Sequence, residues 1–385
     1  MKALAAGPLS GLVVVDASTS YAGPTASMYL ADLGAEVVKV ERPGGDDARQ
    51  WGPPFVGGMS AWFASANRNK RSVVIDLRQE DGRAELESML ATADVFIESF
   101  NPGKLEELGL NPVSVRARHP RLIYCAMSGF GLDGPARDLP GYDLAAQARS
   151  GLMSVTGALG GPPQRVSTAL SDVVTGMCAA LAIAAATVAQ RSSGVGDLID
   201  VSLLDSDLAL MAPRIASYLA GEPEPVPSGG GDSVLAVYQT FETADRPIVV
   251  AIGNDRMWTR FCAALDLNDL AMDARFADNS GRREHRRFIT EAITQRTLAR
   301  PSGEWISVLS SEGIPTSLVQ SLSEVVNDEQ VIARGSLMPL AGRNGLFGVR
   351  SPFRLASVKR PRNDGVPELG ADTAELLGAT RDRGQ

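Results

Sequence analysis

Short apolar runs alternate with helical patterns along the first third of the chain. The runs are rich in Val and Ile, which favours strands, and the segments between them place apolar residues at helical spacing. Buried strands that alternate with helices are typical of a parallel sheet covered by helices on both faces. We therefore expect an α/β fold. The expected strands lie at residues 11–18, 35–41, 71–77, 95–100 and 121–128.

Later segments predict a second, smaller domain. Helical patterns near residues 170–190 and 202–221 are followed by a stretch rich in Pro, Gly and Glu, which is typical of a linker. A new alternation of strand and helix patterns comes after it. We expect a large domain at 1–220 that is completed by 321–385, a linker at 221–233 and a small α/β domain at 234–320.

Charge and hydropathy exclude some classes of function. The 385 residues carry 37 basic and 45 acidic side chains, a formal net charge of −8, which argues against a general binder of nucleic acid or of anionic membranes. The longest uninterrupted apolar stretch, Met177–Ala189, falls short of the roughly 20 residues that span a bilayer. The N-terminal segment lacks a long apolar region typical of signal peptides. We expect a cytoplasmic protein.

Cysteine and histidine offer little chemistry. The three cysteines, Cys125, Cys178 and Cys262, lie far apart in apolar contexts, so we expect reduced residues of the core. The two histidines, His119 and His285, lie beside proline and within a charged run. A histidine-based triad or metal site is not expected, and nucleophilic or acid-base chemistry falls to carboxylates.

Two acids each precede an apolar helical pattern. Asp172 follows Ser171 at the front of the Ala-rich segment, and Asp143 follows Tyr142 at the front of another helical pattern. Either acid would serve as an ordinary helix cap, since a side-chain oxygen there accepts from an unpaired backbone N–H. A pair of such acids also suggests a shared carboxylate site, and the sequence alone leaves both interpretations open.

Two glycine-rich segments are candidate site loops. Residues 129–134, "GFGLDG", match the dinucleotide-binding pattern. Pro135 and Pro140 interrupt the helix that such a motif requires, and no acid lies near position 149, so we expect a glycine loop beside a site. Gly229, Gly230 and Gly231 fit a linker, and such runs also form mobile covers over reacting groups.

The chain as a whole resembles the family III CoA-transferases, the CaiB/BaiF family that includes formyl-CoA transferase and the carnitine CoA-transferases. The resemblance covers nearly the full length. Its marks, in order, are "YAGPTASMYLADLGAEVVKVERPGGDDAR", "NRNKRSVVIDL", "GYDLAAQARSGLMSVTG", "SDVVTGM", "DVSLLDS" and "YQTFETADRPIVVAIGNDRMW". The resemblance implies a Rossmann-like large domain built from both chain ends, a small domain, and an interlocked homodimer.

The resemblance also implies a covalent mechanism. Asp172 matches the family's nucleophile, which attacks an acyl-CoA thioester and carries first a mixed anhydride and then an aspartyl-CoA thioester. Asp172 is expected to be ionised at pH 7, because the ordinary pKa of aspartate is about 3.9. Asp143 and Tyr142 would border the thioester, and Gly229–Gly231 would cover it. Tyr21 stands where formyl-CoA transferase has a glutamine, which puts the formyl and oxalate pair in doubt.

Other positions match the family's CoA-contacting segments. Where formyl-CoA transferase has an arginine, this chain has Glu107, so a contact with a CoA phosphate would be lost or supplied by Lys104. Coenzyme A enters as a substrate, with no tightly bound cofactor and no metal expected. The matching positions are Arg42, Arg78, Phe100, Asn101, Lys104, Tyr142 and Leu203.

Two alternatives remain open at this stage. The 2-methylacyl-CoA racemases resemble this family and use a histidine where this chain has Tyr142, and a tyrosine with a pKa near 10 is a poor base for an α-carbon. A CoA-ester binding protein without turnover is the third class, because a fold does not guarantee an activity. The resemblance to the CoA-transferases implies an acyl-CoA donor and a small carboxylic acid acceptor, and small dicarboxylates such as succinate or mesaconate are typical of that family.

Overall fold

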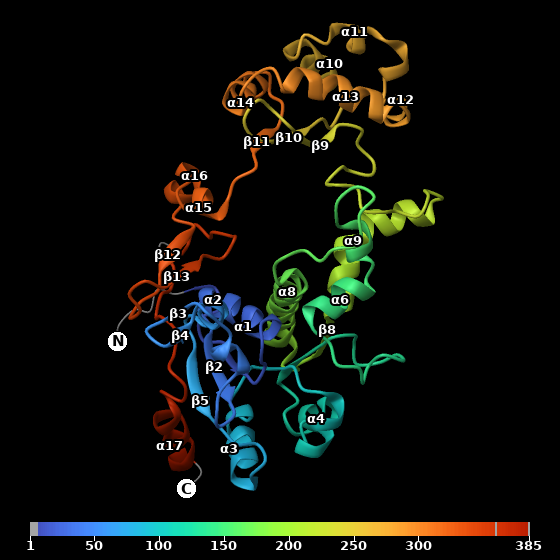
Figure 1. Cartoon of the computed structure of the whole chain (residues 1–385). Helices are drawn as coiled ribbons and strands as arrows, with labels where there is room; N and C mark the ends of the chain where they lie inside the picture. The colour runs from blue at the N-terminus through green and yellow to red at the C-terminus, as the bar shows by residue number, and fades with distance from the viewer. Residues whose placement is uncertain (1–6, 359, 384–385) are drawn as a thin grey trace. The chain divides into compact units, whose positions relative to one another are not determined.

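The computed structural model describes residues 7–358 and 360–383 (Figure 1). The chain forms two compact units, and each is described by itself. Unit 1 consists of residues 1–152, 166–212 and 329–385, and unit 2 of residues 153–165 and 213–328. Unit 2 therefore includes the segment expected as a linker. It also includes residues 153–165, 213–220 and 321–328, which the sequence pattern assigns to the large domain.

Unit 1 is built on a parallel sheet of six strands in the described part of the chain. Their spatial order is β5-β2-β1-β6-β7-β8, and every pairing is parallel. Numbered along the sheet-forming strands alone, this order is 3-2-1-4-5-6, which is the Rossmann arrangement. The α/β prediction is confirmed. The strands are β1 (Val13–Asp16), β2 (Glu36–Glu41), β5 (Arg71–Val74), β6 (Val95–Glu98), β7 (Ile123–Ser128) and β8 (Leu198–Ser202).

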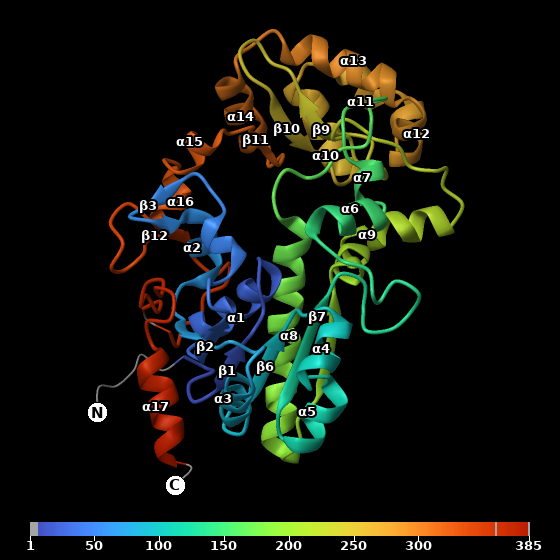
Figure 2. The ribbon, with the colours of Figure 1, turned by 60° about the horizontal axis from the view of Figure 1, so that its bottom comes forward.

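Both faces of this sheet are buried, which explains the uninterrupted apolar runs in the sequence. Val14 packs with α1 and α8 on one face, whereas its neighbour Val15 packs with α3, α4 and α5 on the other. Figure 2 shows helices of both groups around the sheet. The covering helices are α1 (Ala22–Asp32), α3 (Glu80–Leu90), α4 (Pro102–Leu108), α5 (Pro112–Arg118) and α8 (Leu170–Ser193).

Helix α8 is long and apolar. Among the described residues it is the one helix that length and composition would allow to cross a membrane, a test that core helices of globular domains also pass. One side of α8 packs against α1 and the sheet through Ala179 and Ile183, which are fully buried. Its other side exposes Leu181 and Val188, at 73% and 71% of their surface. That apolar side has no cover within the described chain.

The C-terminal segment completes unit 1 at the edge strand β5. Asp372 accepts from the Ser72 backbone N–H at 2.9 Å and from Arg71 Nε at 3.0 Å, and the Asn69 N–H donates to the Gly365 carbonyl at 2.7 Å. The other elements of unit 1 are η1 (Asp47–Gln50), β3 (Phe55–Val56), β4 (Met59–Ser60), α2 (Ala61–Asn67), α6 (Asp143–Arg149), α16 (Glu329–Ala333), β12 (Leu337–Pro339), β13 (Phe347–Val349) and α17 (Thr373–Arg383).

Unit 2 has its own core around an antiparallel sheet of order β11-β10-β9. Trp258, Phe261 and Phe276 are buried in it. Two helices cross from one unit into the other along the chain: α7 (Leu152–Val155) and α9 (Leu203–Leu219), which contains Pro213. The elements of unit 2 are β9 (Tyr238–Phe241), β10 (Ile248–Ala251), α10 (Asp255–Ala264), α11 (Asn268–Met272), η2 (Ala274–Phe276), α12 (Asn279–Glu284), α13 (Arg286–Thr297), α14 (Ser302–Ser311), β11 (Thr316–Leu318) and α15 (Leu322–Val325).

Candidate active site

Two adjoining pockets lie at the carboxyl ends of the parallel strands, within unit 1. The first, here the Asp172 pocket, has a volume of about 290 Å³ and is lined by Ser20, Asn101, Gly129, Tyr142 and Asp172 among others. The second, here the Arg42 pocket, has a volume of about 560 Å³. Thr19 and Phe100 line both pockets. Because β1 and β6 are neighbours where the strand order reverses, the loops after them form the crevice in which Rossmann folds bind ligands.

Asp172 lies in the first turn of α8 and lines its pocket. Among the described residues its carboxylate has no hydrogen bond, and the N-cap residue of α8 is Ala169. The interpretation of Asp172 as a helix cap is therefore wrong. Burial, reinforced by the negative charges of Asp143 and Asp207, raises the pKa of Asp172 from 3.8 to about 7. With a pKa of about 7, Asp172 is only partly ionised at pH 7, so the expectation that it is ionised at this pH is corrected.

Asp143 caps α8 from another helix. It is the first residue of α6, whose N-cap is Tyr142. Its carboxylate accepts from the Ser171 backbone N–H at 2.9 Å and from Gln147 Nε2 at 2.8 Å. Asp143 is only 8% exposed, so it holds the start of α8 from a buried position. This contact explains how Asp172 can occupy the first turn and keep both of its oxygens unbonded.

Asp207 is a third acid in this cluster, and it is not among the residues predicted from the sequence. It lies on α9, and its Oδ2 accepts from Ser171 Oγ at 2.8 Å. Burial raises its pKa, and its Oδ1 is buried without a hydrogen-bond partner. The available signal was an acid between apolar residues in "LLDSDLAL". Asp143, Asp172 and Asp207 thus come from three helices, with Ser171 bonded to two of them.

The glycine loop after β7 forms one wall of the Asp172 pocket. No helix begins at "GFGLDG", so the dinucleotide interpretation fails and the loop lies beside the site, as expected. Gly129 and Gly141 touch through their backbones: a Cβ on Gly129 would lie 2.5 Å from the Gly141 Cα. Real side chains do not approach so closely, so glycine is required at this contact. The same loop brings Arg137 and Tyr142 to the pocket.

The cations expected to contact CoA line the Arg42 pocket, and each has an acidic neighbour. Arg42 pairs with Asp47. Arg78 pairs with Asp76 at 2.8 Å, and Lys104 with Glu107 at 2.6 Å. The side chains of Arg42 and Arg78 are largely exposed, and that of Lys104 is about half exposed. A CoA phosphate would compete with these acids for the cations, and solvent already weakens the ion pairs between them. Lys104, which was expected to supply the phosphate contact of the family's arginine, is paired with Glu107, the residue at the position of that arginine.

The remaining candidates fall in three places. Asn101 is the N-cap of α4, and Leu203 begins α9; both line the Asp172 pocket. Tyr21 is the N-cap of α1, and its hydroxyl lies 2.9 Å from Ser65 Oγ, but it lines neither of the two pockets. Gly229–Gly231 belong to unit 2, where the Gly229 N–H donates to the Gly157 carbonyl at 3.0 Å. Their covering role stays a prediction.

Within residues 7–358 and 360–383 there is no group of three or more His, Cys, Asp or Glu side chains arranged to hold a metal ion. The cysteines of the described chain are free; Cys125 and Cys262 are buried, and Cys178 is partly exposed.

Comparison with known proteins gives concordant results. A family model described as CoA-transferase family III matches residues 9–373. The chain is 37% identical to a succinate–glutarate CoA-transferase of Agrobacterium fabrum, over 96% of this chain and 95% of that protein. It is 35% identical to an acetyl-CoA:oxalate CoA-transferase of Acetobacter aceti, over 96% and 95%. A CaiB/BaiF family protein from Brucella suis, known from its crystal structure, superposes with a TM-score of 0.84 at 36% identity, covering 97% of this chain and 99% of that one.

Proposed function

The chain belongs to CoA-transferase family III, and from that premise we propose that it moves CoA from an acyl-CoA to a free carboxylic acid with Asp172 as the covalent nucleophile. The observation that carries the proposal is the environment of the Asp172 carboxylate. Its carboxylate lines a pocket at the Rossmann switch point, is largely withdrawn from water, and has no hydrogen bond among the described residues. Its oxygens are therefore free to attack.

The proposed reaction needs only the carboxylate and the two substrates. Asp172 attacks the thioester carbonyl, CoA leaves as the thiolate, and a mixed anhydride forms. The thiolate then attacks the aspartyl carbonyl, which gives an aspartyl-CoA thioester and releases the donor acid. The acceptor carboxylate attacks that thioester and forms a second anhydride with loss of CoA thiolate. The thiolate finally attacks the acceptor's carbonyl, which yields the new acyl-CoA and restores Asp172.

The raised pKa of Asp172 suits this chemistry. A carboxylate that burial has stripped of water is a stronger nucleophile than a hydrated one. The nearby charges of Asp143 and Asp207 destabilise the anion further, and this repulsion disappears when Asp172 becomes an uncharged anhydride or thioester. Helices α1 and α8 both begin at the pocket, through Ala22 and Asp172. Their N-termini favour the negative charge that develops on a tetrahedral oxygen.

We assign the CoA moiety to the crevice formed by both pockets. Arg42, Arg78 and Lys104 would meet its phosphates by exchanging their acidic partners. Phe100 lines both pockets and would lie along the pantetheine arm that joins them. The thioester would then lie beside Asp172 and Tyr142.

We assign the acceptor to short dicarboxylic acids. The two relatives are named for succinate and glutarate and for oxalate, which are all dicarboxylic. Arg137 is the one cation among the side chains that line the described Asp172 pocket. Its side chain is 54% exposed, and its ion pair is a 3.4 Å contact with the adjacent Asp138. Arg137 is therefore available to bind the carboxylate that does not react.

We propose further that the chain acts as a cytoplasmic homodimer. The exposed Leu181 and Val188 on α8 form an apolar side that a second copy would cover. Light scattering after size exclusion tests this: a dimer mass in the wild type and a shift toward monomer in Leu181→Glu are expected. A wild-type monomer would contradict the assembly without bearing on the chemistry.

The experiment that tests the reaction is trapping of the covalent intermediate. Protein is incubated with succinyl-CoA, quenched with hydroxylamine and digested, and the peptides are analysed by mass spectrometry. A hydroxamate on Asp172 is expected in the wild type and in the control Asp133→Asn, which changes an acid of the glycine loop that lines neither pocket. An unmodified Asp172 together with deuterium exchange at the acyl α-carbon would contradict the proposal in favour of a racemase. The comparisons do not favour that alternative.

A further inference from the structure

The turn that follows β1 is an unusual part of the binding crevice. Thr19 lines both pockets and Ser20 lines the Asp172 pocket. Ser20 has a φ of 69°, a left-handed conformation that is unfavourable for residues other than glycine. Such strain persists only where the surrounding structure enforces it. The contacts around Ser20 therefore identify what fixes this wall of the crevice.

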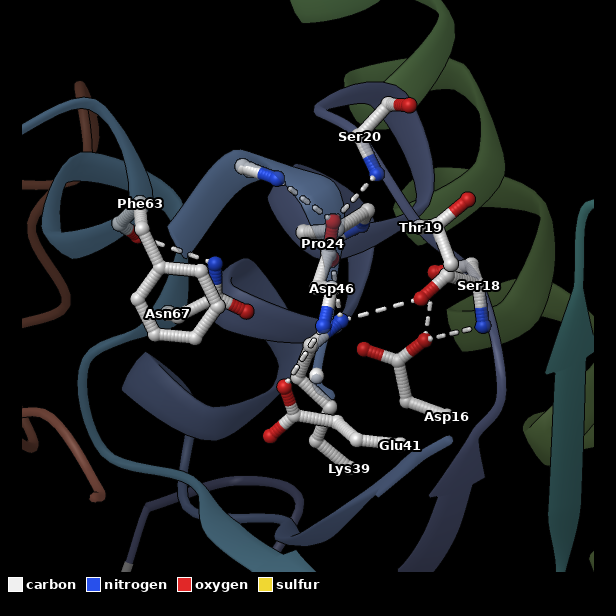
Figure 3. A network of polar contacts seen from close by, with 12 residues as sticks. Asp16, Ser18, Thr19, Ser20, Pro24, Lys39, Glu41, Asp46, Phe63 and Asn67 are labelled. Atoms are coloured by element: carbon white, nitrogen blue, oxygen red, sulfur yellow. Dashed lines mark hydrogen bonds and ion pairs between the residues drawn. The ribbon is translucent and has the colours of Figure 1, made fainter. Parts of the chain in front are cut away.

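A buried ion pair contacts the backbone of the turn (Figure 3), and both of its residues also belong to the lining of the Arg42 pocket. Lys39 Nζ donates to the Ser18 carbonyl at 2.9 Å and pairs with Asp46 Oδ2 at 2.9 Å. Asp46 Oδ1 in turn accepts from the Ser20 backbone N–H at 3.1 Å. The side chains of Lys39 and Asp46 are both completely buried. The pair is thus hydrogen-bonded to the backbone on either side of Thr19.

Further groups fix the ends of the turn. Asp16 Oδ1 accepts from the Ser18 N–H at 3.0 Å, and Lys70 Nζ pairs with Asp16 Oδ2 at 3.3 Å. The Thr19 N–H donates to Ser99 Oγ at 3.1 Å. The loops after β1 and β6 are therefore tied together where both enter the crevice.

Stability alone is a poor explanation for this arrangement. Removing charges from water is costly, and apolar replacements of buried ion pairs are often as stable as the pairs or more so. An apolar pair in place of Lys39 and Asp46 would, however, offer no acceptor to the Ser20 N–H and no donor to the Ser18 carbonyl. What this pair supplies and an apolar pair cannot is a fixed backbone conformation at Thr19 and Ser20.

We propose that Lys39 and Asp46 are positioning residues that hold Thr19 and Ser20 in the conformation required to bind CoA esters and present them to Asp172. This inference rests on the proposed function for the role of the crevice. It concerns the geometry of binding and not the covalent step, so the affinity for CoA itself tests it independently of Asp172.

The test uses Asp46→Asn alone and combined with Ser20→Gly. Asparagine removes the negative charge that pairs with Lys39 and weakens the hydrogen bond from the Ser20 N–H. We expect Asp46→Asn to lower kcat/KM and to raise the Kd for CoA, measured by calorimetry, at least tenfold. Glycine adopts a φ of 69° without strain. Adding Ser20→Gly should therefore restore both quantities by at least threefold.

Asp266→Gly is the matched control. Asp266 also has a positive φ, of 56°, but it lies in unit 2 and lines neither pocket. Added to Asp46→Asn, it relieves comparable strain and should restore neither kcat/KM nor the affinity for CoA. A rescue by Asp266→Gly equal to that by Ser20→Gly would overturn the proposal, because the effect would then be general stabilisation. Wild-type kcat/KM and CoA affinity in Asp46→Asn would overturn it as well.

Ser99→Ala is the second variant, for the case in which Asp46→Asn does not fold. It removes the acceptor of the Thr19 N–H without disturbing a buried charge, at a residue that also lines the Asp172 pocket. We expect the Kd for CoA to rise about threefold to tenfold, as for loss of one hydrogen bond, and an unchanged Kd would contradict the proposal. Trapping of the Asp172 hydroxamate in the wild type is scored separately. A failure of the covalent mechanism is thereby distinguished from a failure of the positioning role.

Discussion

Replacing Asp172 with asparagine should make the protein more stable at neutral pH while abolishing transfer. Asparagine keeps the shape of the side chain and removes the charge that burial disfavours. In the wild type that charge is held at the start of α8, close to Asp143 and Asp207. Burial of the Asp172 charge therefore lowers the stability of the wild type at neutral pH, and the variant lacks this charge.

The size of this effect follows from the pKa shift. The native pKa of Asp172 is raised from 3.8 to about 7, and each unit corresponds to about 1.4 kcal/mol, so the ceiling is roughly 4 kcal/mol. Part of the side chain remains in contact with water, and we expect about 1–3 kcal/mol. For a protein of 385 residues, 2 kcal/mol corresponds to a rise in Tm of about 2–3 °C.

The pH dependence gives the prediction its sign. Between pH 3.8 and about 7 the native state retains a proton on Asp172 that the unfolded chain has lost, so the wild type loses stability as the pH rises through this window. The difference in Tm between Asp172→Asn and the wild type should be close to zero near pH 4, grow up to pH 7 and remain constant above pH 8. Thermal unfolding followed by circular dichroism at each pH measures it.

Asp143→Asn is the control of opposite sign. It replaces the carboxylate that accepts from the Ser171 N–H and Gln147, so it should lower Tm at neutral pH by weakening the start of α8. Equal Tm differences for Asp172→Asn at pH 4.5 and pH 8 would refute the reasoning. So would a variant that is less stable than the wild type at pH 8.

Three further outcomes are expected. The kcat/KM of the wild type should rise with pH through an apparent pKa of about 7, because attack requires the carboxylate of Asp172; a flat profile between pH 6 and 8 would exclude Asp172 as the titrating nucleophile. Gly129→Ala should lower the free energy of unfolding by roughly 2–3 kcal/mol and kcat/KM at least tenfold, because the added Cβ would lie 2.5 Å from the Gly141 Cα. Denaturant unfolding and steady-state rates measure both effects. Gly103→Ala, which has open space around the added Cβ, is the matched control. Arg137→Ala should raise the KM for glutarate about tenfold and leave that for butyrate within about twofold, with Arg137→Lys in between; equal changes for both acids would remove Arg137 from recognition of the second carboxylate.

The sequence predicted the large domain well because its strands are buried on both faces. Runs such as "GLVVVDAS" and "VFIESF" place apolar residues on both sides of the sheet, and they coincide with β1 and β6. Strand β8 was not expected. Its residues Leu198–Ser202 are only partly buried, include an aspartate and lie at the edge of the sheet, so they lack the continuous apolar run that marks a central strand.

The site could be predicted only where a motif named a residue. The roles of Asp172 as nucleophile and of the cations of the Arg42 pocket as CoA contacts are predictions from the family resemblance. Asp207 was missed because its role depends on α9 meeting α8 at Ser171, a contact between residues 36 apart that no local pattern encodes. The raised pKa of Asp172 was missed for a related reason: desolvation is a property of the surrounding fold and not of the side chain.

The completion of unit 1 by its C-terminal segment has a consequence for biosynthesis. Asp372, which bonds to the Ser72 N–H at the edge of the sheet, is made 300 residues after it. At translation rates of about 5–20 residues per second, this partner emerges roughly 15–60 s later. All of unit 2, which has its own buried core, is synthesised in that interval. The outer backbone groups of edge strand β5 therefore stay unpaired until Asp372 has been synthesised, and in that period the nascent protein is open to pairing with other chains.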